Sequence, residues 1–209
     1  MTDTETTTAI ETVTGWHFST GRLRDGREIV PGRWEVHEGP LVLCESGYHL
    51  SERPLDALRY SPGPFVGRVE GRGEMLRDAD KIACRERRYI ESPRDVSRLL
   101  RRFARACALD VIHLWTPPDV VTRWLWTGDE ALRIAASTAA ARAADAAYVY
   151  AAAYAADAAA SAAAASRAIA ASLGAAQNAR LLAWLIGPDL PDVIAPEEIA
   201  ARKEKPHAG

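Results

Sequence analysis

The stretch DEALRIAASTAAARAADAAYVYAAAYAADAAASAAAASRAIAASL, residues 129–173, decides the architecture of the C-terminal half of this 209-residue chain. It contains no glycine or proline, and 29 of the 53 residues from Ala131 to Ala183 are alanine. Alanine is the strongest helix former and loses no side-chain entropy on ordering. The stretch therefore predicts helix. A single rod of this length would extend about 65 Å, so we expect either a helical hairpin or bundle, or pairing with a second chain.

Charged residues within the same stretch exclude a membrane span. The longest uncharged piece of the stretch, Ala146–Ala156, has 11 residues, whereas a spanning helix needs about 20 apolar ones. The N-terminal residues lack the basic and apolar regions of a signal peptide. The net charge is −2, and the three cysteines are widely spaced. These features predict a protein of the cytoplasm with reduced cysteines and no disulfide framework.

Residues 1–91 form a β-rich domain with one short helix. Asp25-Gly26 is the strongest short hairpin signal and predicts a type I′ turn within residues 22–30. Apolar residues at alternating or consecutive positions predict the remaining strands at residues 10–18, 34–37, 41–44, 48–50, 65–69 and 82–90. A short helix is expected at Pro54–Tyr60, started by Ser51.

Helical signals begin at Ser92 and define a second segment, residues 92–186. Ser92-Pro93 predicts the start of a helix that extends to His113, and Thr116–Asp119 predicts a short helix that carries Trp124 and Trp126. Thr127–Glu130 has the spacing of a capping box that opens the alanine-rich stretch. Gly174 is expected to end that stretch, with a last helix at 175–186 and a proline-containing tail at 187–209. The fold class is α+β: a small, mostly antiparallel sheet domain followed by alanine-rich helices.

The stretch CESGYHLSERPLDAL, residues 44–58, resembles an uncharacterised domain family of phages and bacteria. That family has a Cys-x-x-Gly-aromatic-His signature followed by Pro-Leu-Asp-x-Leu, and the similarity extends over residues 14–91. Its members often carry alanine-rich C-terminal segments. The resemblance implies no particular activity. In physical terms, His49 and Asp56 are either functional or hydrogen-bonded parts of a strand-turn-helix corner.

A second likeness is to the ADP-ribosyltransferase folds. Gly47-Tyr48-His49-Leu50-Ser51, followed by Ala57 and Tyr60, resembles the strand-helix piece of those enzymes, although a hairpin signal precedes it where they place a helix. The resemblance implies NAD as cofactor and a catalytic set made of His17, His49, Tyr60 and Glu86, with Glu91 as an alternative acid. His and Tyr would hold the nicotinamide ribose, and the carboxylate would stabilise an oxocarbenium-like centre.

Two further chemical sites are considered. Cys44 is either a nucleophile paired with His49 or a small buried residue at a strand end. No close pair of cysteines or histidines has the spacing of a structural zinc site, so no metal is expected. An arginine-rich face offers an alternative site for phosphate or nucleic acid, or else a solvated surface: Arg94, Arg98, Arg101, Arg102 and Arg105.

Tyrosines on the alanine-rich stretch are the expected anchors of a protein contact. Tyr150 and Tyr154 lie one helical turn apart, with Tyr148 and Asp157 close in sequence. The sequence as a whole contains no complete catalytic set. It therefore favours a non-enzymatic accessory or interaction protein without a cofactor, whose alanine-rich helices mediate self-association or partner docking. NAD-dependent ADP-ribosyl transfer and nucleic-acid binding are the alternatives.

Overall fold

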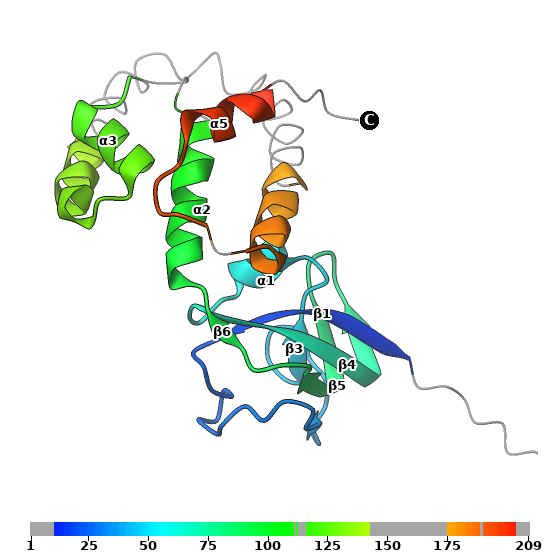
Figure 1. Cartoon of the computed structure of the whole chain (residues 1–209). Helices are drawn as coiled ribbons and strands as arrows, with labels where there is room; N and C mark the ends of the chain where they lie inside the picture. Colours follow the sequence, from blue (N-terminus) through cyan, green and yellow to red (C-terminus); the bar gives the residue numbers. More distant parts are fainter. Residues whose placement is uncertain (1–10, 111, 113–115, 143–174, 189, 204–209) are drawn as a thin grey trace, which may run out of the picture. The chain divides into compact units, whose positions relative to one another are not determined.

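The computed structural model contains two compact units, which divide after Ser97 (Figure 1). It describes residues 11–110, 112, 116–142, 175–188 and 190–203. The first unit is built on strands and the second on helices. This arrangement confirms the α+β class expected from the sequence.

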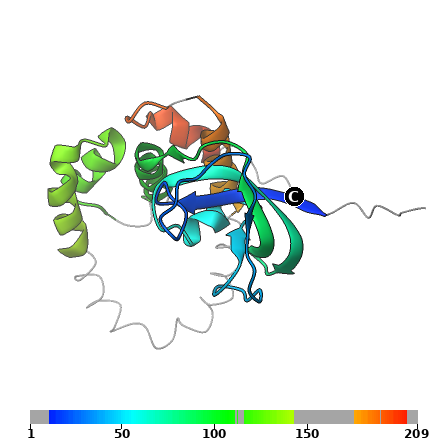
Figure 2. The ribbon, with the colours of Figure 1, turned by 90° about the horizontal axis from the view of Figure 1, so that it is seen from below.

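The first unit is a six-stranded sheet in which every pairing is antiparallel. Its main path follows the order β1-β4-β5-β2, with β3 also paired to β5 and β6 paired to β4. The strand bounds are Thr12–Ser19 (β1), Glu35–Val36 (β2), Tyr48–Leu50 (β3), Phe65–Arg77 (β4), Ile82–Tyr89 (β5) and Arg94–Asp95 (β6). β4 and β5 form the longest pairing, and the sheet curls strongly around them (Figure 2).

A backbone bridge closes the curled sheet into a small barrel. The Trp16 amide donates to the Ser51 carbonyl at 2.8 Å, and the Ser51 amide donates back at 3.1 Å. Ser51 directly follows β3, so β1 meets the far end of the path β1-β4-β5-β3. Gly15 permits this approach, because a Cβ there would lie 2.6 Å from the Ser51 oxygen. Closure leaves fewer strand edges unpaired.

Apolar side chains from all the long strands fill the interior. The buried cluster includes Val69, Ile82 and Cys84, together with Leu50 from β3. Leu23 and Ile29 of the 22–30 hairpin also join it. Outside the barrel, helix α1 (Pro54–Arg59) packs against β1 and buries Ala57. The barrel core on one side and helix α1 on the other therefore fix the strand ends and loops around α1 and β3.

The second unit is helical. Its labelled helices are α2 (Ser97–Asp110), α3 (Asp119–Thr127), the short 3₁₀ helix η2 (Glu130–Leu132) and α5 (Pro196–Lys203). Residues 133–142 and 175–186 are also helical. Ile194 and Ile199 are buried in one cluster with Leu109 and Leu125. Both isoleucines belong to the stretch expected as a tail, 187–209, so side chains of that stretch contribute to the core of the second unit.

Several local predictions need correction. The 22–30 hairpin forms, but only Gly26 has a positive φ in its turn, so the turn is not type I′. Residues 41–44 are a turn with Cys44 exposed, instead of a buried strand. Residues 94–95 pair with β4, which delays the helix expected at Pro93 until Ser97. The cap residue of α1 is Arg53 and not the expected Ser51. The cap residue before the alanine-rich stretch is Asp129 and not the expected Thr127.

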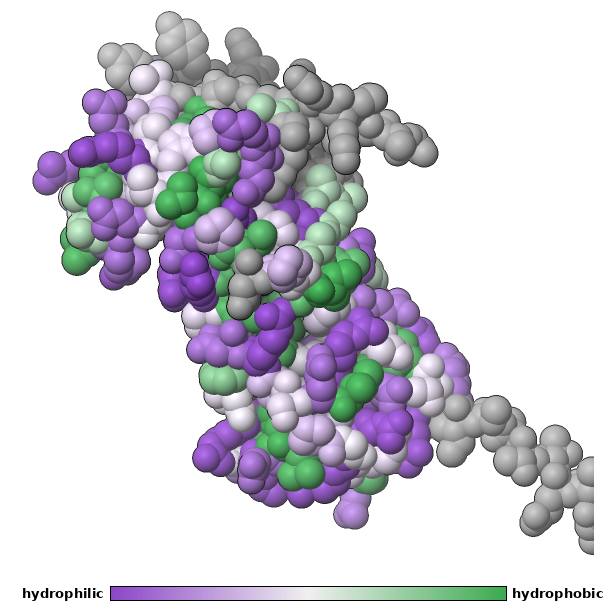
Figure 3. All heavy atoms as spheres, in the orientation of Figure 1, coloured by the Kyte–Doolittle hydropathy of each residue, from purple (hydrophilic) through white to green (hydrophobic). Residues whose placement is uncertain are grey.

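Most of the alanine-rich stretch lies outside the described residues. Residues 143–174 belong to that part, so the expected hairpin or bundle and the tyrosine contact remain predictions. The visible surface of the described residues is mainly hydrophilic, with small hydrophobic patches between (Figure 3). Among the described residues, no helix is both long and apolar enough to cross a membrane.

Candidate functional site

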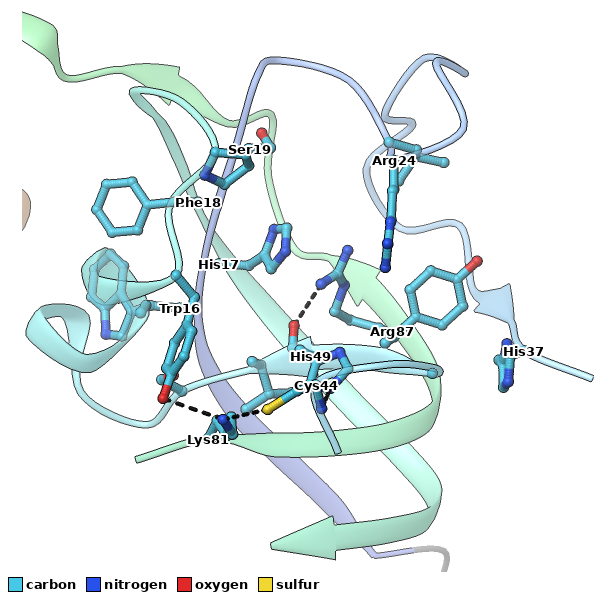
Figure 4. Close-up of a pocket in the computed structure, with 18 of the residues that line it drawn as sticks. Trp16, His17, Phe18, Ser19, Arg24, His37, Cys44, His49, Lys81 and Arg87 are labelled. Atoms are coloured by element: carbon cyan, nitrogen blue, oxygen red, sulfur yellow. Dashed lines mark hydrogen bonds between the residues drawn. The ribbon is translucent and has the colours of Figure 1, made fainter. Parts of the chain in front are cut away.

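The barrel opens into a cavity of about 980 Å³ beside β1 and β3 (Figure 4). Its lining comes from β1, the 22–30 hairpin, His37 after β2, the 41–47 loop, β3, α1 with the turn that follows it, and β5 with the turn before it. A volume of this size lies at the upper end of the range for small-molecule sites in proteins. The cavity can therefore hold a ligand as large as a dinucleotide.

Arg87 supplies a buried positive charge to this cavity. Its side chain extends from β5, and the residue is only 5 % exposed. The guanidinium donates a hydrogen bond to the carbonyl of His49 at 2.5 Å, and it lies over the rings of Tyr48 and Tyr89. Neither the carbonyl nor the rings carry a formal charge. Burial lowers the pKa of Arg87, and no described carboxylate forms an ion pair with it.

Two histidines lie beside this guanidinium. His17 on β1 points toward Arg87 (Figure 4) and shares a 2.6 Å hydrogen bond with the Tyr89 hydroxyl. Burial, and after it the charge of Arg87, hold the pKa of His17 well below its ordinary value. His49 on β3 accepts a hydrogen bond from the Cys44 amide through Nε2 at 3.1 Å, and burial lowers its pKa as well. Both imidazoles are therefore neutral at pH 7 and can donate and accept hydrogen bonds.

A second group lies at the wall of the cavity. Lys81, in the turn before β5, donates to the Cys44 sulfur at 2.7 Å and to the Tyr60 hydroxyl at 3.3 Å. The hydrogen bond to Cys44 raises the pKa of Lys81 most, and the hydrogen bond to Tyr60 raises it further. The Tyr60 hydroxyl in turn donates to Asp80 at 2.8 Å. This group joins the 41–47 loop to the end of α1.

The cavity is basic overall. Its charged lining residues are Arg22, Arg24, Lys81 and Arg87 on the basic side and Asp25 and Glu45 on the acidic side. Asp25 already forms an ion pair with Arg27 at 2.7 Å. Arg24 extends toward Arg87 from the hairpin (Figure 4). Like charges gathered around a water-filled space favour an anion there.

The structure brings three of the four residues of the ADP-ribosyltransferase set to one place. His17, His49 and Tyr60 all line the cavity. Glu86 does not: it lies on β5 in an ion pair with Arg72 at 2.7 Å, away from the cavity lining. Glu91 is exposed and lies outside the lining as well. The expectation that Glu86 belongs to this set was wrong, because neighbouring residues of a strand point to opposite faces and Arg87 takes the inner one.

The arginine-rich face does not exist as an open surface. Arg102 is 2 % exposed and donates to the Pro191 carbonyl and to Glu198, both at 2.7 Å. Arg105 donates to the carbonyls of Leu125 and Asp192. Of the remaining three, Arg98 forms an ion pair with Asp192, Arg94 lies on β6, and Arg101 is exposed. Two of the five side chains are thus fastened inside the second unit, so the five cannot bind phosphate together.

Sequence reasoning missed Arg87 and Lys81. Arg87 lies in the run CRERRY, residues 84–89, where it resembles the arginines around it. A two-residue period does not distinguish it, because the buried Ile82 and Cys84 have the opposite parity in β5 from the buried Arg87 and Tyr89. Lys81 gave no signal, because its proximity to Cys44 depends on the loop between β2 and β3. The other expected site residues, Tyr148, Tyr150, Tyr154 and Asp157, lie outside the described residues.

The part of the chain that the structure describes contains no candidate metal site. There, no group of three or more histidine, cysteine or acidic side chains could hold a metal ion. The three cysteines form no disulfide, and Cys84 is buried among the apolar residues of the barrel.

Residues 15–101 match the model of a domain of unknown function, DUF7666. The match confirms an uncharacterised domain over nearly all of the sheet unit and includes the 44–58 stretch. No curated protein and no solved structure matches the chain.

Proposed function

We propose that the sheet unit is a binding module for a small anionic ligand, and specifically for a phosphate-bearing molecule of nucleotide or dinucleotide size. The observation that supports this most strongly is the buried guanidinium of Arg87, which contacts a carbonyl and two aromatic rings and forms no ion pair with a carboxylate of the described residues. Burying a charge without a counter-charge is costly. A bound anion beside Arg87 would supply the missing counter-charge.

The remaining lining fits the same class of ligand. Guanidinium groups bind phosphate in a two-pronged geometry. Arg24 extends toward Arg87 (Figure 4), and Arg22 also lines the cavity. Neutral imidazoles at His17 and His49 offer further donors. Aromatic side chains in the lining, Tyr48 and Tyr60 among them, provide flat apolar surface for a base or nicotinamide ring.

NAD is the natural first ligand to test, because His17, His49 and Tyr60 lie in one cavity as the likeness to ADP-ribosyltransferases requires. Transfer of ADP-ribose is less well supported than binding. The carboxylate expected to stabilise an oxocarbenium-like centre, Glu86, pairs with Arg72 outside the cavity. We therefore propose binding, and no group-transfer step.

Isothermal titration calorimetry on the full chain tests this proposal. The ligands are NAD, ADP, inorganic pyrophosphate and the uncharged nucleoside adenosine. We expect saturable heat from at least one phosphate-bearing ligand and none from adenosine, with affinity that weakens as salt is added. The variant Arg87→Met should abolish the heat, and the control Arg59→Met, which removes an exposed arginine outside the cavity lining, should leave it intact. Equal binding by wild type and Arg87→Met would refute the proposal.

The interaction role of the alanine-rich stretch is a separate proposal, supported by its sequence. Helices covered by alanine bury little apolar area by themselves, and the chain as a cytoplasmic accessory protein would use them to bind a second copy or another protein. Light scattering coupled to size-exclusion chromatography tests it. We expect a dimer or higher oligomer, and replacement of Tyr150 and Tyr154 by serine should shift it toward monomer. A wild-type monomer that captures no partner would contradict this role.

A further inference from the structure

The 41–47 loop carries an unusual cysteine. Cys44 is exposed, has a backbone φ of 70°, and its sulfur lies 2.7 Å from the Lys81 ammonium group. It also lines the cavity described above, on the opposite side of His49 from Arg87 (Figure 4). The structure thus combines a nucleophilic atom, a cation that contacts it and an open route from solvent.

The other two cysteines provide a comparison within the same chain. Cys84 is fully buried, and burial raises its pKa to about 11. Cys107 is partly buried, and its sulfur accepts a long hydrogen bond of 3.9 Å from Arg180, which forms an ion pair with Asp110. Reactive cysteines are accessible and adjacent to a cation, whereas buried structural cysteines are inert. Of the three, Cys44 alone combines exposure with a lysine in direct contact.

We propose that Cys44 is a thiol modification site at the wall of the cavity, oxidised by peroxides and alkylated by small electrophiles, with Lys81 as its positioning residue. This inference does not depend on the proposed function, because it concerns the sulfur and not a ligand in the cavity. The approach from solvent passes the exposed loop.

The oxidation step is a two-electron transfer. The sulfur attacks one oxygen of hydrogen peroxide, an S–O bond forms, and the O–O bond breaks. The second oxygen leaves as hydroxide and takes up the thiol proton to become water. Sulfur is oxidised to sulfenic acid and the peroxide is reduced.

Modification at this position would alter the cavity. The Cys44 amide donates to Nε2 of His49, and Lys81 also donates to Tyr60. An added oxygen or alkyl group must displace Lys81 or shift the loop, because the sulfur and the ammonium group are already in contact. Modification of Cys44 would therefore affect His49 and Tyr60, which both line the cavity.

Competitive labelling of the reduced full chain tests the proposal. Limiting iodoacetamide is added, and the extent of alkylation at each cysteine is followed by peptide mass spectrometry. We expect Cys44 to react about tenfold or more faster than Cys107 and Cys84. Lys81→Met should slow Cys44 about tenfold, and Lys81→Arg should retain most of the rate. Arg59→Met removes a nearby charge that pairs with Asp80 and does not touch the sulfur, so it serves as the matched control.

The outcomes separate the proposal from its rivals. A Cys44 rate no faster than that of Cys107 overturns it. So does equal slowing by Lys81→Met and Arg59→Met, which would show that only the general charge of the surface matters. The rates at Cys84 and Cys107 in each variant report whether the fold is intact. A parallel treatment with hydrogen peroxide, followed by a sulfenic-acid trap, should label Cys44 and leave the Cys44→Ser variant unlabelled.

Discussion

Replacing the buried arginine of the cavity, Arg87, by methionine distinguishes a ligand-binding arginine from a structural one. The Arg87→Met variant loses one hydrogen bond, which Arg87 donates to the His49 carbonyl. A hydrogen bond to a charged group contributes about 1.5–3 kcal/mol. The same substitution removes a buried cation without a carboxylate partner, and the cost of burying such an ion is several kcal/mol. We therefore expect the free energy of unfolding of the sheet unit to stay within about 1 kcal/mol of wild type, or to increase.

Arg102 is the matched comparison, because it is buried to a similar degree. It pairs with Glu198 at 2.7 Å and with the Pro191 carbonyl, and it stacks on Trp184. Methionine at this position removes the ion pair between Arg102 and Glu198. Breaking a buried pair costs about 3–5 kcal/mol, and we expect the lower end because Glu198 is 31 % exposed.

Hydrogen exchange followed by mass spectrometry reads the two units separately in the full chain. Amides of β5 report the sheet unit, and amides of α2 report the helical unit. We expect Arg87→Met to leave protection in β5 unchanged or increased, and Arg102→Met to reduce protection in α2. A loss in β5 for Arg87→Met as large as the loss in α2 for Arg102→Met would refute the reasoning, since Arg87 would then be a structural strut.

Three further predictions follow from single residues. The unfolded chain binds a proton at His17 below pH about 6.5, whereas burial keeps the imidazole of the folded chain neutral. The free energy of unfolding therefore falls on acidification. Denaturant titrations at about pH 7.5 and 5.5 should show a smaller fall for His17→Gln than for wild type. Gly15→Ala places a Cβ 2.6 Å from the Ser51 carbonyl, so it should lower the free energy of unfolding by about 1–3 kcal/mol and speed hydrogen exchange at the Trp16 and Ser51 amides. The control Gly39→Ala meets only the flexible side chain of His37 and should do neither. Asp129→Ala removes the cap that accepts from the Ala131 amide at 2.9 Å and should lower the stability of the following helix by about 1 kcal/mol, visible as faster exchange at residues 131–135; unchanged exchange would contradict the capping role.

The sequence predicts those parts of the site that depend on local pattern. Alternation and turn signals located β1, β3 and α1, and these elements carry His17, His49 and Tyr60 into one cavity. Each prediction needed only a residue and its near neighbours in the chain. The same local reasoning placed helix 175–186 and the α+β class correctly.

The rest depends on pairings between distant segments. Arg87 and Arg102 are both buried, although charged side chains are ordinarily exposed, and only the tertiary structure reveals that one faces a cavity and the other a carboxylate. Cys44 was expected at the end of a buried strand, but the 41–47 loop turns it outward to Lys81. No pattern within the 41–47 loop records that contact, since Lys81 lies 37 residues further along the chain.

The central claim is that an anion binds beside the buried guanidinium of Arg87. Nuclear magnetic resonance of the histidine rings tests it most directly, because His17 and His49 lie next to that guanidinium. Titration of the full chain with ADP should shift the ring signals of both histidines in a saturable manner and have no such effect in Arg87→Met. Signals of His17 and His49 that stay unchanged up to millimolar ADP and pyrophosphate, or that shift equally in Arg87→Met, would contradict the claim.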